Sequence, residues 1–349
     1  MDELKSLAEA AGYTVIGEIE QVRRADPRYQ IGEGKAEEIA KLVSNLNVER
    51  VIFGNDLKPV QAYNLAKLLG IEVIDRFQLI LEIFVRRAST KEAKLQIALA
   101  KLKYELARAK EKVRLAKMGE QPGFSGLGKY QVDVYYEMIR RRIKSIERKL
   151  KKIRKTRALH RRHRKKLGFP LVSLAGYTNS GKSTLFNSLT SENVPTDCEV
   201  FTTLSTTVRL ANLGENEILI TDTVGFIDNL PISLIEAFRS TLEEMVYSDL
   251  ILLVIDISDP IQEIKRKVGC CLDTIKQIGA ARLPIIAALN KIDLLNDSEL
   301  DKKLSLITKW VPNPVPISAL YKINLELLKD EIQKHIQFSL GIPATIRII

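Results

Sequence analysis

One octapeptide constrains the fold of this chain more than any other feature. Residues 176–183 read Gly-Tyr-Thr-Asn-Ser-Gly-Lys-Ser and match the phosphate-binding loop G-x-x-x-x-G-K-[ST] at every fixed position. The apolar run 171–175 predicts a buried strand before the loop, and residues 184–189 predict the first turns of a helix after it. Because N–H groups at a helix N-terminus attract phosphates, this order predicts an α/β domain that binds a nucleoside triphosphate. An unoccupied glycine turn is the alternative.

Three side chains of this loop have predicted tasks. Lys182 is expected to reach the β- and γ-phosphates, and Ser183 to ligate Mg²⁺. Asn179 offers a carbonyl oxygen beside the phosphates, where K⁺ could neutralise charge that develops during hydrolysis; bracing of the loop is the alternative. The predicted phosphate contacts are Gly176, Tyr177, Thr178, Asn179, Ser180, Gly181, Lys182, Ser183 and Thr184.

A second motif, Asn290-Lys291-Ile292-Asp293, predicts that the base is guanine. It follows the apolar run 283–289, so it is expected at the carboxyl end of a strand. The Asp293 carboxylate can accept hydrogen bonds from the ring N1–H and the exocyclic amine of guanine, a donor pair that adenine lacks. We expect Asn290 to brace the loop and the stem of Lys291 to cover the base; a surface turn is the alternative. With the backbone donors of a second loop, the predicted base contacts are Asn290, Lys291, Ile292, Asp293, Ser318, Ala319 and Leu320.

Two loops between these motifs are predicted to respond to the γ-phosphate of GTP. Asp222 follows the strand-like run 217–221 and is expected to hold the Mg²⁺ shell, while the Gly225 N–H senses the γ-phosphate. From a hydroxyl-rich run, Thr203 is predicted to complete the Mg²⁺ coordination, with Thr202 as second choice and an edge strand as the alternative. The predicted contacts here are Phe201, Thr202, Thr203, Leu204, Ser205, Asp222, Thr223, Val224 and Gly225.

The residue after Gly225 bears on the reaction rate. Phe226 stands where many GTPases carry a glutamine that orients the attacking water, and a phenyl ring neither donates nor accepts that hydrogen bond. We therefore expect slow intrinsic hydrolysis of GTP. The residues predicted to act on the reaction are Asn179, Lys182, Thr203 and Gly225.

The positive charge of the chain is confined to one segment. The 349 residues have a net charge of +11, but residues 140–166 hold sixteen Lys and Arg against one acid and reach +15, which leaves −4 elsewhere. Such a dense run repels itself, so a polyanionic partner, above all a nucleic acid, is the favoured explanation. An anionic membrane surface or plain solvation is the alternative. Since no Trp or Phe interrupts the run, phosphate contact is expected rather than base stacking.

Two apolar stripes with alternating spacings of four and three residues predict an antiparallel helical hairpin. A glycine-rich connection, residues 119–130, lies between them and is longer than a turn requires. We interpret it as a probing loop; a flexible connector is the alternative. The stripes are Leu95, Leu99, Leu102, Leu106, Ala109, Val113 and Ala116, and Val132, Tyr136, Ile139, Ile143, Ile146, Leu150 and Ile153.

The segment before the hairpin alternates between strand-like and helix-like stretches, which predicts a small parallel α/β domain. Its strands are expected at 48–54 and 71–74, and its helices at 34–46 and 58–69. Residues 32–35, Gly-Glu-Gly-Lys, lack the frame of a phosphate loop and are expected to open a helix; a second nucleotide site is the alternative.

Nothing in the composition indicates a secreted or membrane-spanning protein. There is no run of eighteen apolar residues and no basic-then-apolar signal at the N-terminus. Cys198, Cys270 and Cys271 fit neither metal-ligand spacing nor a disulfide framework, and we interpret them as reduced thiols. We expect a cytoplasmic monomer.

With these motifs, the chain resembles the HflX family of translational GTPases over nearly its full length. The resemblance implies binding to the large ribosomal subunit, entry of the hairpin loop near the peptidyl transferase centre and, in some members, separation of stalled ribosomes into subunits. A phenylalanine at the position of Phe226 is itself a trait of the family. The matching segments are residues 34–38, Asp75-Arg76, the heptad arm from Lys94, the glycine loop, and residues 176–179, 201–204 and 222–226.

We therefore expect an α/β protein in three parts, with GTP-gated binding to the large ribosomal subunit as its function. The rival interpretations are an RNA-binding or RNA-remodelling protein that its GTPase domain regulates, and a GTPase of the membrane surface. The expected parts are a small α/β domain (1–88), a coiled-coil hairpin with a basic linker helix (89–168) and a P-loop GTPase domain (169–349).

Overall fold

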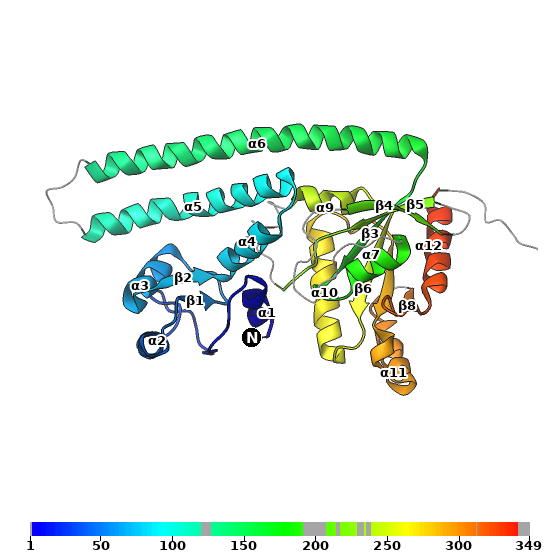
Figure 1. Cartoon of the computed structure of the whole chain (residues 1–349), viewed down its shortest axis with the longest axis horizontal. Coiled ribbons are helices and arrows are strands. Elements are labelled where there is room, and N and C mark those ends of the chain that lie inside the picture. Colours follow the sequence, from blue (N-terminus) through cyan, green and yellow to red (C-terminus); the bar gives the residue numbers. More distant parts are fainter. Residues whose placement is uncertain are drawn as a thin grey trace, which may run out of the picture. The chain divides into compact units, whose positions relative to one another are not determined.

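The computed structural model describes residues 2–119, 127–190, 207–213, 217–228, 234, 239–311 and 313–340 (Figure 1). The chain forms two compact units. One comprises Met1–Arg86 with Lys94–Ile153, and the other comprises Arg87–Ala93 with Arg154–Ile349. Within the described part of the chain, no helix has both the length and the apolar composition that crossing a bilayer requires.

The first unit begins with the predicted small α/β domain, and the prediction is confirmed. Strands β1 and β2 pair in parallel, with Val51 opposite Val73, and the helices between and before them cover the pair with a core that includes Val43 and Leu65. A parallel pair needs such a crossover helix. The elements are α1 (Asp2–Ala10), α2 (Glu33–Leu46), β1 (Arg50–Phe53), α3 (Pro59–Leu69), β2 (Glu72–Asp75) and α4 (Arg76–Arg87).

The hairpin helices are α5 (Lys91–Gly119) and α6 (Leu127–Leu167), which run side by side in Figure 1. The predicted stripes meet between them: Leu99 of α5 is buried in one cluster with Ile139, Ile143 and Leu150 of α6. The predicted helical pair is confirmed. Of the predicted loop 119–130, Gly119 ends α5 and residues 127–130 already belong to α6, so the loop is shorter than predicted. Residues 120–126 lie outside the described residues, and the probing role stays a prediction.

A buried carboxylate fastens the hairpin to the α/β domain. Asp75, at the end of β2, is fully buried and accepts hydrogen bonds from Tyr104 Oη and Arg108 Nη2 of α5, both at 2.7 Å. The Tyr104 ring also stacks on Phe77, with 4.6 Å between ring centroids. Because a buried charge is stable only when paired and hydrogen-bonded, these contacts fix the register of α5 on the domain.

The second unit contains a six-stranded sheet in the order β4-β5-β3-β6-β7-β8, as predicted for the GTPase domain. All neighbouring strands are parallel except β4 and β5, which are antiparallel. The strands are β3 (Leu171–Gly176), β4 (Thr207–Asn212), β5 (Glu217–Asp222), β6 (Leu250–Asp256), β7 (Ile285–Asn290) and β8 (Pro314–Pro316).

Helices cover both faces of this sheet, and the central strands β3, β6 and β7 are accordingly apolar at most positions. In β6, Leu250, Leu252 and Val254 face the cluster that holds α7 and α12, whereas Ile251 and Leu253 face the cluster that holds α9, α10 and α11. The described helices are α7 (Lys182–Thr190), α9 (Arg239–Val246), α10 (Ile261–Gln277), the 3₁₀ turn η1 (Ile292–Leu294), α11 (Asp297–Ile307) and α12 (Leu325–Leu340). The predicted motifs therefore follow the carboxyl ends of parallel strands, where ligands bind in such sheets.

Candidate nucleotide-binding site

The loop between β3 and α7 has a backbone that only glycine fits at two positions. Gly176 has φ 153°, and a Cβ there would lie 2.4 Å from the carbonyl oxygen of Val254. Gly181 has φ 90°, and its Cβ would lie 2.2 Å from Nδ2 of Asn290. The two fixed glycines of the motif are thus explained by close approach to β6 and to the end of β7.

Lys182 lies under the loop, with 7% of its surface exposed, and its Nζ donates to the carbonyl oxygen of Tyr177 at 2.7 Å. Burial lowers the pKa of its ammonium, and the nearby Asp222 carboxylate partly opposes that shift. Gly225 closes over the same group, because a Cβ on Gly225 would lie 3.0 Å from Nζ. A desolvated cation is therefore held where the motif predicts a phosphate.

The segment after Asp222 pairs with the phosphate loop, an arrangement that the sequence did not predict. Thr178 N donates to Phe226 O at 2.8 Å, and Phe226 N donates to Gly176 O at 3.0 Å. The Phe226 ring is 1% exposed and belongs to the apolar cluster that also contains Met245. The ring thus packs in the core, and what the segment offers to the site is its backbone.

Ser183 and Asp222, which were each predicted to lie near Mg²⁺, are in contact, with Ser183 Oγ donating to Asp222 Oδ2 at 2.9 Å. Thr223 Oγ1 donates to Leu174 O at 2.6 Å and anchors the loop that follows Asp222. A hydroxyl and a carboxylate supply the hard oxygen atoms that Mg²⁺ prefers, so this pair fits the metal. The remaining predicted ligand, Thr203, lies with Phe201, Thr202, Leu204 and Ser205 outside the described residues.

Asn290 joins the three predicted loops. Its Nδ2 donates to Ser180 O at 2.9 Å, and its Oδ1 accepts from Ala319 N at 2.9 Å. Both bonds are buried, so the brace predicted for Asn290 has a physical basis. Ser188 Oγ of α7 donates to Ala319 O at 2.7 Å and ties the same loop from the other side.

The carboxylate of Asp293 is exposed at the end of this assembly, and Ile292 is half-buried beside it. Ser318 is fully buried, while Leu320 is 67% exposed. The predicted use of this loop's backbone donors by the base is not supported for Ser318 and Ala319, because Ser318 N donates to Ile323 O and Ala319 N donates to Asn290 Oδ1. An exposed carboxylate on a braced loop is available to a ligand.

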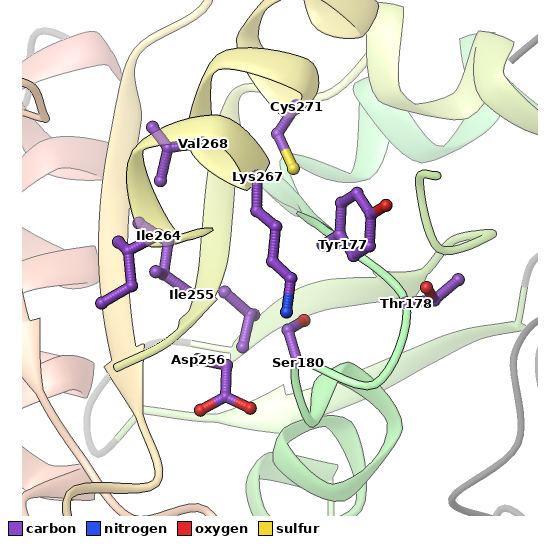
Figure 2. Close-up of a pocket in the computed structure, with 10 residues that line it drawn as sticks. Tyr177, Thr178, Ser180, Ile255, Asp256, Ile264, Lys267, Val268 and Cys271 are labelled. Atoms are coloured by element: carbon purple, nitrogen blue, oxygen red, sulfur yellow. The ribbon is translucent and has the colours of Figure 1, made fainter. Parts of the chain in front are cut away.

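The sequence did not single out Asp256, which ends β6. Its Oδ2 lies 2.5 Å from Nζ of Lys291. A signal existed, because an acid directly after the apolar run 250–255 is expected at the same sheet edge as the other motifs. Asp256 also lines a cavity of about 10 Å³ behind the phosphate loop, shown in Figure 2, where the amino group of Lys267 is directed toward Ser180. That volume holds about one water molecule.

Most of the chain matches known protein families. Residues 171–291 match the family described as a 50S ribosome-binding GTPase. The preceding regions match the families described as GTP-binding GTPase N-terminal, over residues 1–85, and GTP-binding GTPase Middle Region, over residues 87–164.

Individual relatives agree with these family matches. The GTPase HflX of Methanocaldococcus jannaschii is 50% identical over 341 residues, which cover 98% of this chain and 84% of that protein. The GTPase HflX of Escherichia coli is 36% identical over 348 residues, with 96% and 80% covered. A crystal structure of a GTP-binding protein from Sulfolobus solfataricus in complex with GDP is 30% identical, covers 97% of this chain and 95% of its own, and has a TM-score of 0.51. With these matches over nearly its whole length and a phosphate loop, a Ser–Asp pair and a guanine motif at one sheet edge, the chain belongs to the HflX family and is a GTPase.

Proposed function

We propose that this GTPase binds the large ribosomal subunit in a GTP-dependent manner through its basic helix and glycine-rich loop. The observation that carries the proposal is the connection of the basic helix α6 to α9, the helix that follows the Asp222–Gly225 loop in the sequence. Glu244 of α9 is buried and accepts from Arg164 Nη2 at 2.8 Å and Arg161 Nη1 at 3.3 Å, both near the end of α6. Arg161 also lies over the Tyr247 ring, 4.1 Å from its centroid.

These contacts support a route from the nucleotide to the basic helix. A buried carboxylate with two guanidinium partners is costly to break on one side only, so α9 and the end of α6 are expected to move together. α9 follows the segment in which Gly225 covers Lys182. A γ-phosphate that binds Lys182 must displace the Gly225 segment. We expect α9 to follow that movement and to transmit it to α6 through Glu244.

In this proposal the site residues have the tasks that their chemistry suits. Lys182 exchanges the Tyr177 carbonyl for phosphate oxygens, and the Gly225 N–H reports the γ-phosphate. Ser183 and Thr203 hold Mg²⁺, with Asp222 behind Ser183; the ion, when bound, neutralises charge on the β- and γ-phosphates. In the base pocket, Asp293 reads guanine, Asn290 braces, and Lys291 covers the ring. Since the buried Phe226 ring offers no hydrogen bond to water, the unstimulated rate is expected to be low.

The chemistry of the basic helix supports a phosphate-rich partner. The side chains of Arg148, Lys151 and Lys155 are exposed, and the segment 140–166 carries a net charge of +15. Contacts of this kind are electrostatic and weaken with salt. The match to a 50S ribosome-binding GTPase family favours the large ribosomal subunit over other RNA. Separation of stalled ribosomes into subunits and a cytoplasmic, monomeric state belong to the same proposal.

The test is the rate of GTP hydrolysis as purified large subunits are titrated in, with small subunits and duplex RNA as controls. We expect large subunits alone to raise the hydrolysis rate at least about tenfold. This is a lower bound, since catalytic groups supplied by a partner raise the rate of other GTPases by about 10³–10⁵-fold. Replacing Lys151 and Lys155 together by alanine should weaken subunit binding and reduce its salt slope by about two, whereas the same change at the exposed Lys302 and Lys334 should not. Equal stimulation by any RNA, or a flat response, would contradict the proposal and favour the RNA-binding alternative.

A second prediction concerns K⁺. Asn179 is exposed in the phosphate loop. Its φ of 60° is a left-handed backbone conformation that asparagine tolerates. We expect hydrolysis to be about tenfold faster in potassium than in sodium salts, because a cation beside the phosphates stabilises developing charge. Asn179→Ala should remove this preference without lowering GDP affinity. Equal rates of the unchanged protein in the two salts would contradict the role of Asn179.

A further inference from the structure

The loop that reads the base is held by an ion pair as well as by Asn290. Lys291 has φ 70°, a strained conformation for a lysine, so its backbone needs support from its surroundings. Its Nζ lies 2.5 Å from Asp256 Oδ2, and the two side chains are 25% and 12% exposed. The pair therefore lies mostly out of water, where a charge interaction is stronger than on an open surface.

Asp256 is itself held in one orientation. Its Oδ1 accepts from Ser258 N at 3.0 Å and from Ser258 Oγ at 2.5 Å, which leaves Oδ2 directed to the lysine. Asp256 pairs with Asn290 in the β6–β7 register, and Ile257 N donates to Asn290 O at 3.0 Å. The strand ends that carry the carboxylate and the guanine motif are thus locked to each other.

The neighbouring cation does not compete for this carboxylate. In Figure 2 the Asp256 carboxylate is directed away from the amino group of Lys267, although both side chains line the same cavity. Lys267 Nζ instead donates to Asp259 Oδ2 at 2.6 Å. Two Asp–Lys pairs therefore lie side by side, one bound to the base-reading loop and one not.

We propose that Asp256 is a positioning residue for guanine nucleotides, which acts by anchoring Lys291 Nζ so that the four-carbon stem forms a fixed apolar wall against the purine. The proposal rests on the proposed role of the guanine motif. A free lysine side chain loses rotamer entropy when it is fixed on binding, and the anchor removes part of that loss in advance. Because Asp256 lies behind the base loop and not at the phosphates, its effect should be the same for GTP and GDP.

Asp256→Asn provides the test, because the amide keeps the size of the side chain and can still accept from Ser258 while losing its charge. We expect GDP and GTP affinities to fall about tenfold, the scale of one charge-assisted hydrogen bond, mainly through faster dissociation. KM for GTP should rise while kcat at saturating GTP stays unchanged. Asp259→Asn, which breaks the matched pair with Lys267, should change nucleotide dissociation less than about twofold.

A second experiment, which tests whether Asp256 acts through Lys291, introduces Asp256→Asn into the Lys291→Ala variant. If Asp256 acts through Lys291, the second change adds nothing to the dissociation rate, which a double-mutant cycle measures directly. A full additional loss in that background, or a fall in kcat with KM unchanged, would overturn the proposal. If Lys291→Ala weakens binding and Asp256→Asn does not, only this inference fails. If neither Lys291→Ala nor Asp293→Asn weakens guanine nucleotides, the proposed base site itself fails.

Discussion

Replacing Lys182 with alanine is expected to abolish tight GTP binding while leaving the fold as stable as before. Two charge-assisted hydrogen bonds to phosphate oxygens are worth about 3–6 kcal/mol together, which corresponds to a loss of about 10²–10⁴-fold in affinity. The folded, nucleotide-free protein loses little, because burial disfavours the charged ammonium and the hydrogen bond that is lost is the one to Tyr177 O. Titration with GDP and GTP, together with thermal unfolding, measures both effects.

The pH dependence gives this prediction a second readout. Burial lowers the pKa of Lys182 in the folded protein below its ordinary value of 10.5, so the unfolded chain binds the proton more tightly. Stability of the nucleotide-free protein should therefore rise with pH in the range just below 10.5, and the Lys182→Ala variant should lose that part of the rise. Lys334→Ala, at an exposed position of α12, is the control and should change neither property. Retained GTP affinity in Lys182→Ala would mean that the phosphate loop is not the site.

The parts of the fold that the sequence predicted are those with a strict local pattern. The stripe from Ile139 to Leu150 repeats every three to four residues, and the structure buries these positions against α5. The apolar run 171–175 predicted a buried strand before the phosphate loop, as found for β3, which is buried at every position. The guanine motif was predicted from its spacing and the preceding strand alone. Its Asn290 was expected to brace its own loop, and the structure also bonds it to the loops of Ser180 and Ala319.

What the sequence could not predict depends on contacts between distant segments. Nothing distinguishes Glu244 from its neighbour Glu243 in the sequence, yet Glu244 is buried beside two arginines that precede it by 80 and 83 residues. The sequence predicted slow hydrolysis from the Phe226 side chain, which cannot hydrogen-bond to water. The pairing of the Phe226 backbone with the phosphate loop has no sequence signature. Periodicity and motif spacing report local geometry; the partner of a single polar or backbone group is decided only when the chain is folded.

The same contacts change how the basic helix is understood. Residues 140–166 form one charged segment in the sequence, but the structure gives its members different surroundings. Arg148 and Lys155 are exposed, whereas Arg161 and Arg164 are partly buried against Glu244. Only the exposed members are suited to phosphate contact, whereas Arg161 and Arg164 are already paired with Glu244 of α9. Charge density alone therefore overstates how many cations a polyanion can reach.

Asp293→Asn is expected to exchange the preference for guanine nucleotides for xanthine nucleotides. An asparagine amide can donate to the 2-oxygen of xanthine and accept from its N1–H, but it can no longer accept both guanine protons. GTP loses that charge-assisted pair of hydrogen bonds, and its exocyclic amine then faces the NH₂ donor of the asparagine. Its affinity should fall about 10²–10³-fold, while the affinity for XTP rises by a comparable factor. Competition of GTP, XTP and ATP for a fluorescent nucleotide measures the exchange.

The structure makes this substitution a clean test of base reading. The Asp293 side chain is exposed, so its change removes no buried contact, and the loop position is fixed separately by the Asn290 bonds to Ser180 and Ala319. Asp297→Asn, the same change four residues on at the start of α11, should leave the preference for GTP intact, because that carboxylate lies outside the guanine motif. Unchanged selectivity in Asp293→Asn would show that another group reads the base. A loss of GTP without any gain for XTP would instead mean that the loop itself had moved, since an intact loop must present the new amide to the purine edge.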